Sequence, residues 1–172
     1  MIGPVADADG YEFTRQDAEG ATLHFPANEG HVATALGDLA SYLTTEGSPP
    51  GLVDDVRIVL AEILNNVEEH AYAGQPGHPV TVRLEFAGDS LRCVVEDRGH
   101  GFPAARLPDP EMPAGNPAAL ETLPEGGFGW PLVRKLTRDV AYRRDGGTNR
   151  LVFSVTARPA STDMRPDMDN RA

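Results

Sequence analysis

The 172-residue sequence is poor in basic side chains: 15 Lys and Arg residues stand against 26 Asp and Glu residues, a formal net charge of −11. A protein that binds nucleic acid displaces counterions with a continuous basic stripe. No run of basic residues in this chain is longer than a pair such as Arg143-Arg144. We therefore expect no direct contact with DNA or RNA.

Cysteine is nearly absent as well, since Cys93 is the single one and lies in an alternating apolar run. One thiol excludes a disulfide framework and a cysteine-based zinc site, so we expect a buried, inert side chain. The sequence also lacks an apolar run of about 18 residues, the length that crosses a membrane, and a secretory signal at its start. These absences predict a cytoplasmic protein that does not contact a membrane.

Composition predicts one domain with less ordered ends. Residues 1–20 are polar and weakly patterned, and residues 158–172 hold few apolar side chains, so we expect a flexible N-terminal segment and a disordered tail around a domain at 21–157. Residues 102–126 contain six prolines. A loop of that length inside a compact domain is usually functional or mobile, and we interpret it as a mobile lid.

Hydrophobic periodicity predicts the main elements. Residues 21–25 alternate like a strand, and Asn28 is placed to cap a first helix. The longest helix is expected from Pro49-Pro50 to Gly74. The later elements are strands at 80–86 and 91–96, a helix at 130–139, and strands at 140–144 and 151–157 around Asp145-Gly146-Gly147. This order predicts an α+β fold: a two-layer α/β sandwich with helices on one face of a mixed, mainly antiparallel sheet.

The longest predicted helix carries a polar row. Glu62, Asn66 and His70 stand at i, i+4 and i+8, so they project from one face of the helix. A carboxylate beside an amide oxygen suits Mg²⁺, which takes one or two protein ligands and completes its shell with water and phosphate oxygens. Spacing alone favours the alternative of a solvated helix face, because neighbouring residues are polar too.

A second pattern follows the strand at 91–96. Asp97, Gly99 and Gly101 place a carboxylate at a strand end, followed by two glycines one residue apart. The carboxylate can accept a hydrogen bond from an exocyclic amine while the glycine backbone lies flat against a ring, which suits a purine. An ordinary turn is an equally good interpretation of this pattern by itself.

A third pattern, Gly127-Phe128-Gly129, closes the proline-rich loop and opens a helix. Glycines at a helix N-terminus let backbone N–H groups approach an anion that the helix dipole also favours. Glycine also serves loops in general, so the pattern gains weight only in combination with the other two.

With these three patterns in this order, the sequence resembles the Bergerat-fold (GHKL-type) ATPases, and within them the bacterial anti-sigma-factor serine/threonine-protein kinases. The resemblance runs from about residue 21 to residue 155. It implies ATP and Mg²⁺ as cofactors, with Glu62 as the catalytic base and Asn66 as the magnesium ligand. The nucleotide-binding residues that it implies are Asn66, His70, Asp97, Gly99, Gly101, Gly127, Phe128, Gly129 and Thr148, the last near the adenine.

The resemblance also implies an activity and partners. Such a kinase sequesters a sigma factor, phosphorylates a small anti-sigma antagonist protein on serine, and often forms a homodimer. The predicted lid departs from the family, because no Lys or Arg lies between Arg106 and Arg134 and Glu125 stands where relatives often have an arginine. An anionic lid repels the γ-phosphate. The alternatives are therefore a nucleotide-gated protein-interaction module with little or no kinase activity, and a water-directed ATPase.

A few residues are left with two interpretations. Trp130 either covers the nucleotide or packs in the core, the second being commoner for a large aromatic residue. Arg134-Lys135 either reaches a phosphate or complements the acidic chain. The histidines outside the polar row have no second ligand at metal spacing, so we expect structural or solvent-facing roles for them.

Overall fold

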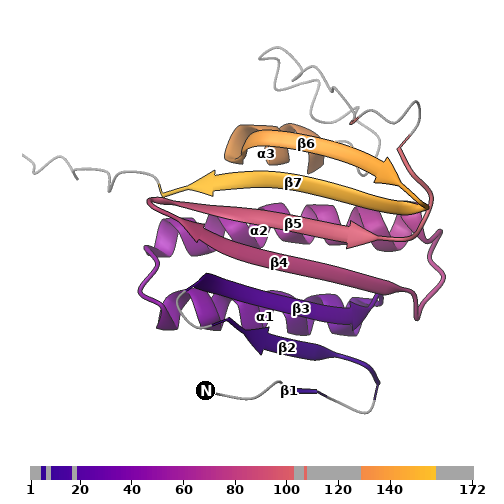
Figure 1. Ribbon diagram of the computed structural model, residues 1–172, viewed down its shortest axis with the longest axis horizontal. Helices are drawn as coiled ribbons and strands as arrows, with labels where there is room; N and C mark the ends of the chain where they lie inside the picture. Colours follow the sequence, from indigo (N-terminus) through magenta and orange to yellow (C-terminus); the bar gives the residue numbers. More distant parts are fainter. Residues whose placement is uncertain (1–4, 7–8, 17–18, 103–106, 108–128, 158–172) are drawn as a thin grey trace, which may run out of the picture.

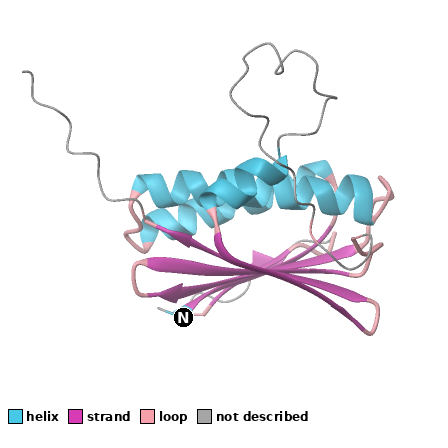
Figure 2. Ribbon diagram, turned by 90° about the horizontal axis from the view of Figure 1, so that it is seen from above, coloured by secondary structure: helices cyan, strands magenta, loops and turns pink. Residues whose placement is uncertain are grey.

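A computed structural model describes residues 5–6, 9–16, 19–102, 107 and 129–157. Its seven-stranded sheet has the order β1-β2-β3-β4-β5-β7-β6, and the helices cover one face of that sheet (Figures 1 and 2). The predicted α+β sandwich is confirmed. Every pairing between the described strands is antiparallel. Within the described residues the sheet is therefore fully antiparallel, not mixed as the sequence suggested.

Along the chain, three strands at one edge of the sheet come first, and two long helices, a central hairpin, a short helix and a C-terminal hairpin follow. The strands are β1 (Val5–Ala6), β2 (Glu12–Arg15), β3 (Gly20–Pro26), β4 (Pro79–Ala87), β5 (Ser90–Asp97), β6 (Arg138–Asp145) and β7 (Thr148–Thr156). The helices are α1 (Glu29–Thr45), α2 (Pro50–Asn66), the π-helix η2 (Val67–Ala71) and α3 (Gly129–Leu136). Within the described part of the chain, none of these helices has the length and apolar character needed to cross a bilayer.

The N-terminal region is more ordered than its composition indicated. Residues 1–20 were expected to be a flexible segment, but Glu12–Arg15 pairs with β3 as strand β2. Tyr11 and Phe13 are buried in the core there. The short alternation of apolar residues around Phe13 indicates a strand, but the polar composition of the whole segment concealed it. The tail at 158–172 lies outside the described residues, as does nearly all of the predicted lid at 102–126.

The core forms where the apolar stripes of α1 and α2 meet the sheet. Asn28 caps α1 as predicted, because its side-chain Oδ1 accepts a hydrogen bond from the backbone N–H of His31 at 2.8 Å. Leu39 and Leu60 are fully buried against strand residues such as Phe153. Cys93 is buried in this core, and desolvation raises the pKa of its thiol, which suits an inert side chain.

The end of the long helix differs from the prediction that it continues to Gly74. The α-helical part ends at Asn66, and a π-helical turn follows to Ala71. Tyr72 then fixes the helix end to two strands: its hydroxyl donates to the carbonyl of Pro79 at 2.6 Å and accepts from the N–H of Arg98 at 2.8 Å. These tertiary bonds, rather than helix propensity, determine where the helix stops.

The C-terminal hairpin confirms one prediction and shortens another. Gly146 and Gly147 both have positive φ, at 54° and 84°, as a tight Asp-Gly hairpin turn requires. The helix expected at 130–139 ends at Leu136, however, and β6 begins at Arg138. Asp139 has a φ of 53°, within an irregularity where β6 shifts register against β7. A β-bulge at this place turns the chain directly from helix to strand.

Two buried tyrosines provide a matched test of the helix end. Replacing Tyr72 with Phe leaves a carbonyl and an N–H without their partner, so we expect unfolding free energy to fall by about 1–3 kcal/mol. Tyr42 is fully buried, and its hydroxyl has no hydrogen-bond partner among the described residues. Tyr42→Phe should therefore leave stability unchanged or raise it. Urea denaturation of both variants measures the difference, and equal losses would contradict the role of the Tyr72 hydroxyl.

Candidate functional site

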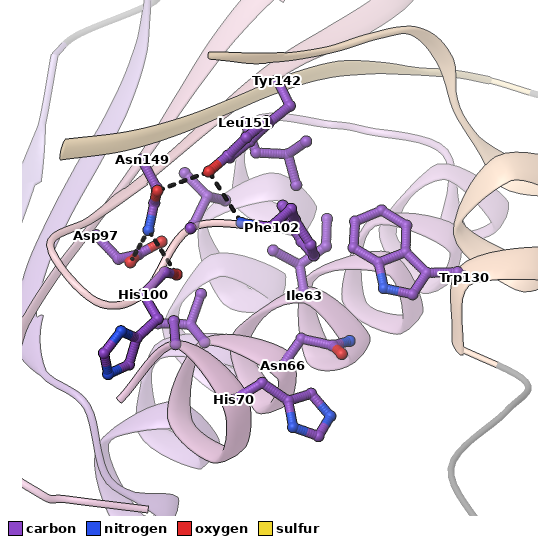
Figure 3. A pocket seen from close by; sticks show the side chains of 14 residues that line it. Ile63, Asn66, His70, Asp97, His100, Phe102, Trp130, Tyr142, Asn149 and Leu151 are labelled. Carbon is purple, nitrogen blue, oxygen red and sulfur yellow. Dashed lines mark hydrogen bonds between the residues drawn. The ribbon is translucent and has the colours of Figure 1, made fainter. Parts of the chain in front are cut away.

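A cavity of about 510 Å³ opens between the helical layer and the sheet, at the ends of β5 and β7 (Figure 3). Its walls come from α2 and η2 on one side, from β5, β6 and β7 on the other, and from the loop after β5 and the start of α3. The lining residues are Ile63, Asn66, Val67, His70, Ala71, Val95, Asp97, His100, Gly101, Phe102, Trp130, Tyr142, Asn149 and Leu151.

Asp97 provides the carboxylate of this cavity from the last position of β5, and it is 7% exposed. Its Oδ1 accepts from the backbone N–H of Gly99 at 2.8 Å and from the side-chain amide of Asn149 at 2.7 Å. Its Oδ2 has no donor within the described part of the chain. Burial raises the pKa of Asp97, while the two hydrogen bonds and the charge of Arg144 act in the opposite direction.

Asn149 holds this carboxylate in place. It lies on β7 directly opposite Asp97 in the strand register and is 4% exposed. Besides bonding Asp97, its amide donates to the carbonyl of His100 at 3.1 Å, and its Oδ1 accepts from the Tyr142 hydroxyl at 2.7 Å and from Arg144 at 2.5 Å. Figure 3 shows this chain of bonds from β6 to the end of β5. One amide therefore positions the carboxylate and the loop that follows it.

The helix side brings together two of the predicted residues. Asn66 and His70 line the cavity, and both side chains project from the helix beneath it in Figure 3. The Asn66 amide donates to the backbone carbonyl of Glu62 at 2.5 Å, so its oxygen is left as an acceptor. An amide oxygen of this kind is a suitable Mg²⁺ ligand.

Glu62 lies beside the cavity rather than in its lining. Its half-buried carboxylate faces Gly129, the first residue of α3, so closely that a Cβ at position 129 would collide with Oε2. The two predicted residues Glu62 and Gly129 are thus in contact with each other. In this arrangement α3 begins directly against the carboxylate, and a side chain at position 129 would require Glu62 to move.

The two glycines after Asp97 are needed for close approach. A Cβ at Gly99 would lie 2.5 Å from the carbonyl carbon of Ala71, where the loop packs on the end of η2. The neighbouring N–H of His100 donates to the Ala71 carbonyl at 2.7 Å. A Cβ at Gly101 would lie 2.9 Å from the Tyr142 hydroxyl. The glycine box therefore brings this loop against both walls of the cavity.

Among the described residues of the prediction, Gly99 and Gly129 lie beside the cavity like Glu62, and Thr148 lies on the other face of the sheet. Thr148 lines a separate hollow, with His24 and Thr81, because adjacent residues of a strand point to opposite faces of the sheet. Asn149, its neighbour, lines the cavity, and the role of Thr148 near the adenine stays a prediction. Gly127 and Phe128 lie outside the described residues.

The remaining walls are apolar and aromatic. Trp130 is half-buried, packs against the edge of the core and lines the cavity, and its ring meets Phe102 edge-on with centroids 5.2 Å apart. Val95 and Leu151 form the sheet wall, and Ile63 the helix wall. A flat ring held between apolar walls, with a carboxylate at the edge that carries its amine, is an arrangement that fits adenine.

Sequence reasoning missed Asn149, Tyr142 and Phe102. One signal for Asn149 was available: it is in phase with Leu151 and Phe153, whose alternation marks the helix-facing side of β7, whereas Thr148 is out of phase. The Tyr142 bond depends on how β6 and β7 pair, which has no local sequence pattern.

Comparison with known proteins supports the same interpretation. Residues 25–155 match the model of the histidine kinase-like ATPase domain family. The chain is similar to a serine-protein kinase RsbW of Oceanobacillus iheyensis, at 25% identity over 145 residues that cover 84% of this chain and 91% of the relative. The RsbW of Bacillus mycoides is 27% identical over 79% of this chain and 84% of its own.

A solved structure shares the fold. The RsbU and RsbW domains of a Mycobacterium tuberculosis protein match with a TM-score of 0.54 at 20% identity, over 81% of this chain and 33% of that one. The sheet with one helical layer is therefore the architecture of this group of proteins.

Replacing Asp97 with Asn separates binding from stability. The variant keeps an oxygen for Gly99 and Asn149 but presents an amide donor to the nucleotide amine, so ATP affinity should fall by about 1.5–3 kcal/mol in calorimetry.

Because burial raises the folded-state pKa of Asp97, the wild type loses stability as pH rises from the ordinary pKa of 3.8 through the folded value. Asp97→Asn should then be at least as stable as the wild type at pH 7.

Asp89, exposed in the turn between β4 and β5, supplies the control. Asp89→Asn makes the same chemical change and should leave ATP affinity as it is. A folded Asp97→Asn protein with wild-type ATP affinity would place the nucleotide elsewhere.

Proposed function

The chain belongs to the histidine kinase-like ATPase domain family, and we propose that it is an ATP- and Mg²⁺-dependent anti-sigma-factor serine/threonine-protein kinase. In this proposal it binds a sigma factor and phosphorylates a small anti-sigma antagonist protein on serine. The relatives named serine-protein kinase RsbW support the activity. The observation that carries the proposal is the buried Asp97 carboxylate, fixed by Asn149 and facing Asn66 across one cavity.

Nucleotide recognition follows from the sheet side of the cavity. The free Oδ2 of Asp97 accepts a hydrogen bond from the exocyclic amine of adenine, while Asn149 keeps the carboxylate from turning. Val95 and Leu151 lie against one face of the base and exclude water from this hydrogen bond. A charged acceptor in a desolvated place makes a stronger bond than a neutral one.

The phosphate end follows from the helix side. Asn66 would hold Mg²⁺ through its amide oxygen, and a bound Mg²⁺ neutralises charge on the phosphate oxygens. Glu62 stands one helical turn before Asn66 and accepts the proton of the attacking serine hydroxyl. Its position against Gly129 places this carboxylate beside the first turn of α3.

The second candidate function is the nucleotide-gated interaction module, and one observation favours it. Among the described lining residues the cavity has no Lys or Arg, and its only ionisable nitrogen groups are the imidazoles of His70 and His100. The sequence between Arg106 and Arg134 adds none. Binding of ATP without efficient transfer is the behaviour that such a weakly cationic site favours. A water-directed ATPase uses the same Glu62.

Three purified components separate these functions: the protein, γ-labelled ATP and a panel of candidate antagonist proteins. Label on an antagonist serine supports the kinase, release of labelled phosphate without antagonist supports the ATPase, and nucleotide binding without either supports the gated module. Light scattering of the same samples tests whether the chain forms the homodimer that the family resemblance implies.

The roles of Glu62 and Asn66 are tested by a pair of substitutions. Glu62→Gln should keep ATP binding and lower phosphoryl transfer by ~10² to 10⁴, because the proton acceptor is lost. Asn66→Ala should weaken Mg²⁺-dependent ATP binding, because a metal ligand is lost. Calorimetry with and without Mg²⁺, together with initial rates of labelling, measures both.

Matched controls come from the same stretch of helix. Glu69 and Asn65 are exposed and lie outside the cavity lining, so Glu69→Gln and Asn65→Ala should behave like the wild type. Full transfer by Glu62→Gln would assign that glutamate a structural role at the start of α3.

A further inference from the structure

Positive charge is concentrated at one side of this acidic protein. The stretch 134–145 has two acidic residues and five basic ones, a net charge of 5 − 2 = +3 in a chain of −11. The helical layer of α1, α2 and η2 has the opposite character, with seven acidic residues against Arg57 alone, or 1 − 7 = −6. The basic residues of the stretch are Arg134, Lys135, Arg138, Arg143 and Arg144.

This basic stretch includes the edge of the sheet. Strand β6 ends the strand order and pairs only with β7 among the described strands, as Figure 1 shows. From Ala141 to Asp145 its pairing with β7 is regular. Its other side therefore presents a row of backbone N–H and C=O groups that can pair with a further strand.

The cations of β6 lie on both faces of that edge. Arg144 is opposite Asn149, on the face that the helices cover, whereas Arg143 is opposite Arg150, on the open face. Arg138 is opposite Ser154, and Lys135 is exposed at the end of α3 next to the strand. A strand that pairs with β6 would thus have a cation within reach on either face.

Little negative charge compensates these side chains. Arg143 contacts Asp145 at 2.9 Å, but both side chains are about three-quarters exposed, so the pair is weak. Lys135 and Arg138 form no ion pair with another described residue. Arg144 bonds two neutral oxygens, those of Gly99 and Asn149. Within the described part of the chain, the charges of Lys135, Arg138 and Arg143 are thus little compensated, whereas that of Arg144 acts on Asp97.

We propose that the outer edge of β6, together with Lys135, docks an extended acidic segment of a partner protein by strand addition. Main-chain hydrogen bonds to β6 supply part of the affinity, and carboxylates opposite Arg138 and Arg143 supply the specificity. A second copy of this chain is a weaker fit to the same edge, because two β6 strands would bring two net-positive stretches together. The proposal does not depend on phosphoryl transfer.

The docked segment would lie next to the nucleotide cavity. Tyr142, in the middle of β6, is part of the cavity wall and bonds both Asn149 and the N–H of Phe102. An acidic partner held on this edge is therefore placed beside the loop that follows Asp97.

The test uses a fluorescein-labelled peptide of repeated Thr-Glu-Glu and the full chain. We expect saturable binding by fluorescence anisotropy, and slower hydrogen–deuterium exchange of the 138–145 amides when the peptide is present. Arg143→Glu and Arg138→Glu should each weaken binding about threefold to tenfold, since an attractive cross-strand pair becomes a repulsive one. The same peptide N-methylated at every residue should not bind, because both of its edges have lost their donors.

Arg57→Glu is the matched control, since Arg57 is also exposed and undergoes the same charge change on the helical layer. It should bind the peptide as the wild type does. Equal weakening by Arg57→Glu and Arg143→Glu would reduce the effect to overall charge and overturn the proposal, as would unchanged exchange in β6. Absence of saturable binding would show that the cations only protect the edge from aggregation. If a charge-reversed variant does not fold, Arg143→Gln replaces it.

Discussion

The site depends on one buried hydrogen bond between two strands, from the Asn149 amide to the Asp97 carboxylate. A carboxylate that is 7% exposed has lost most of its hydration, and a neutral amide compensates only part of that loss. The bond exists because Asp97 and Asn149 are direct partners in the β5–β7 register. A slip of one residue would turn Asn149 away from the helices, so the strand pairing and the site are specified together.

The same arrangement explains why the protein tolerates an energetically unfavourable group in its interior. Burial raises the pKa of Asp97, which means that ionisation weakens the folded state. An Asn at this position would be easier to bury but would present the wrong hydrogen-bonding group to a nucleotide amine. Under the proposed function, the carboxylate serves recognition rather than stability.

The sequence predicts the features that depend on residues close together in the chain, and it does not predict those that depend on contacts between distant segments. The polar row of α2 and the glycine box after β5 were predictable, since each is set by spacing along a few residues. Asn149 rather than Thr148 faces the cavity because of the phase of β7, which the family pattern does not include. Tyr142 was missed, and the end of the long helix was placed too late, because both depend on contacts between segments far apart in the sequence. Strand β2 was missed because a polar composition concealed two buried aromatic residues.

The contact between Gly99 and Ala71 has a consequence for how this protein can change over evolutionary time. The loop backbone at Gly99 rests on the last turn of η2 so closely that a Cβ at position 99 would collide with the backbone carbonyl of Ala71. His100 fastens the same turn through the Ala71 carbonyl. Because that carbonyl belongs to the backbone, no substitution at position 71 would make room for a side chain at position 99, so glycine is expected to persist there in descendants of this chain.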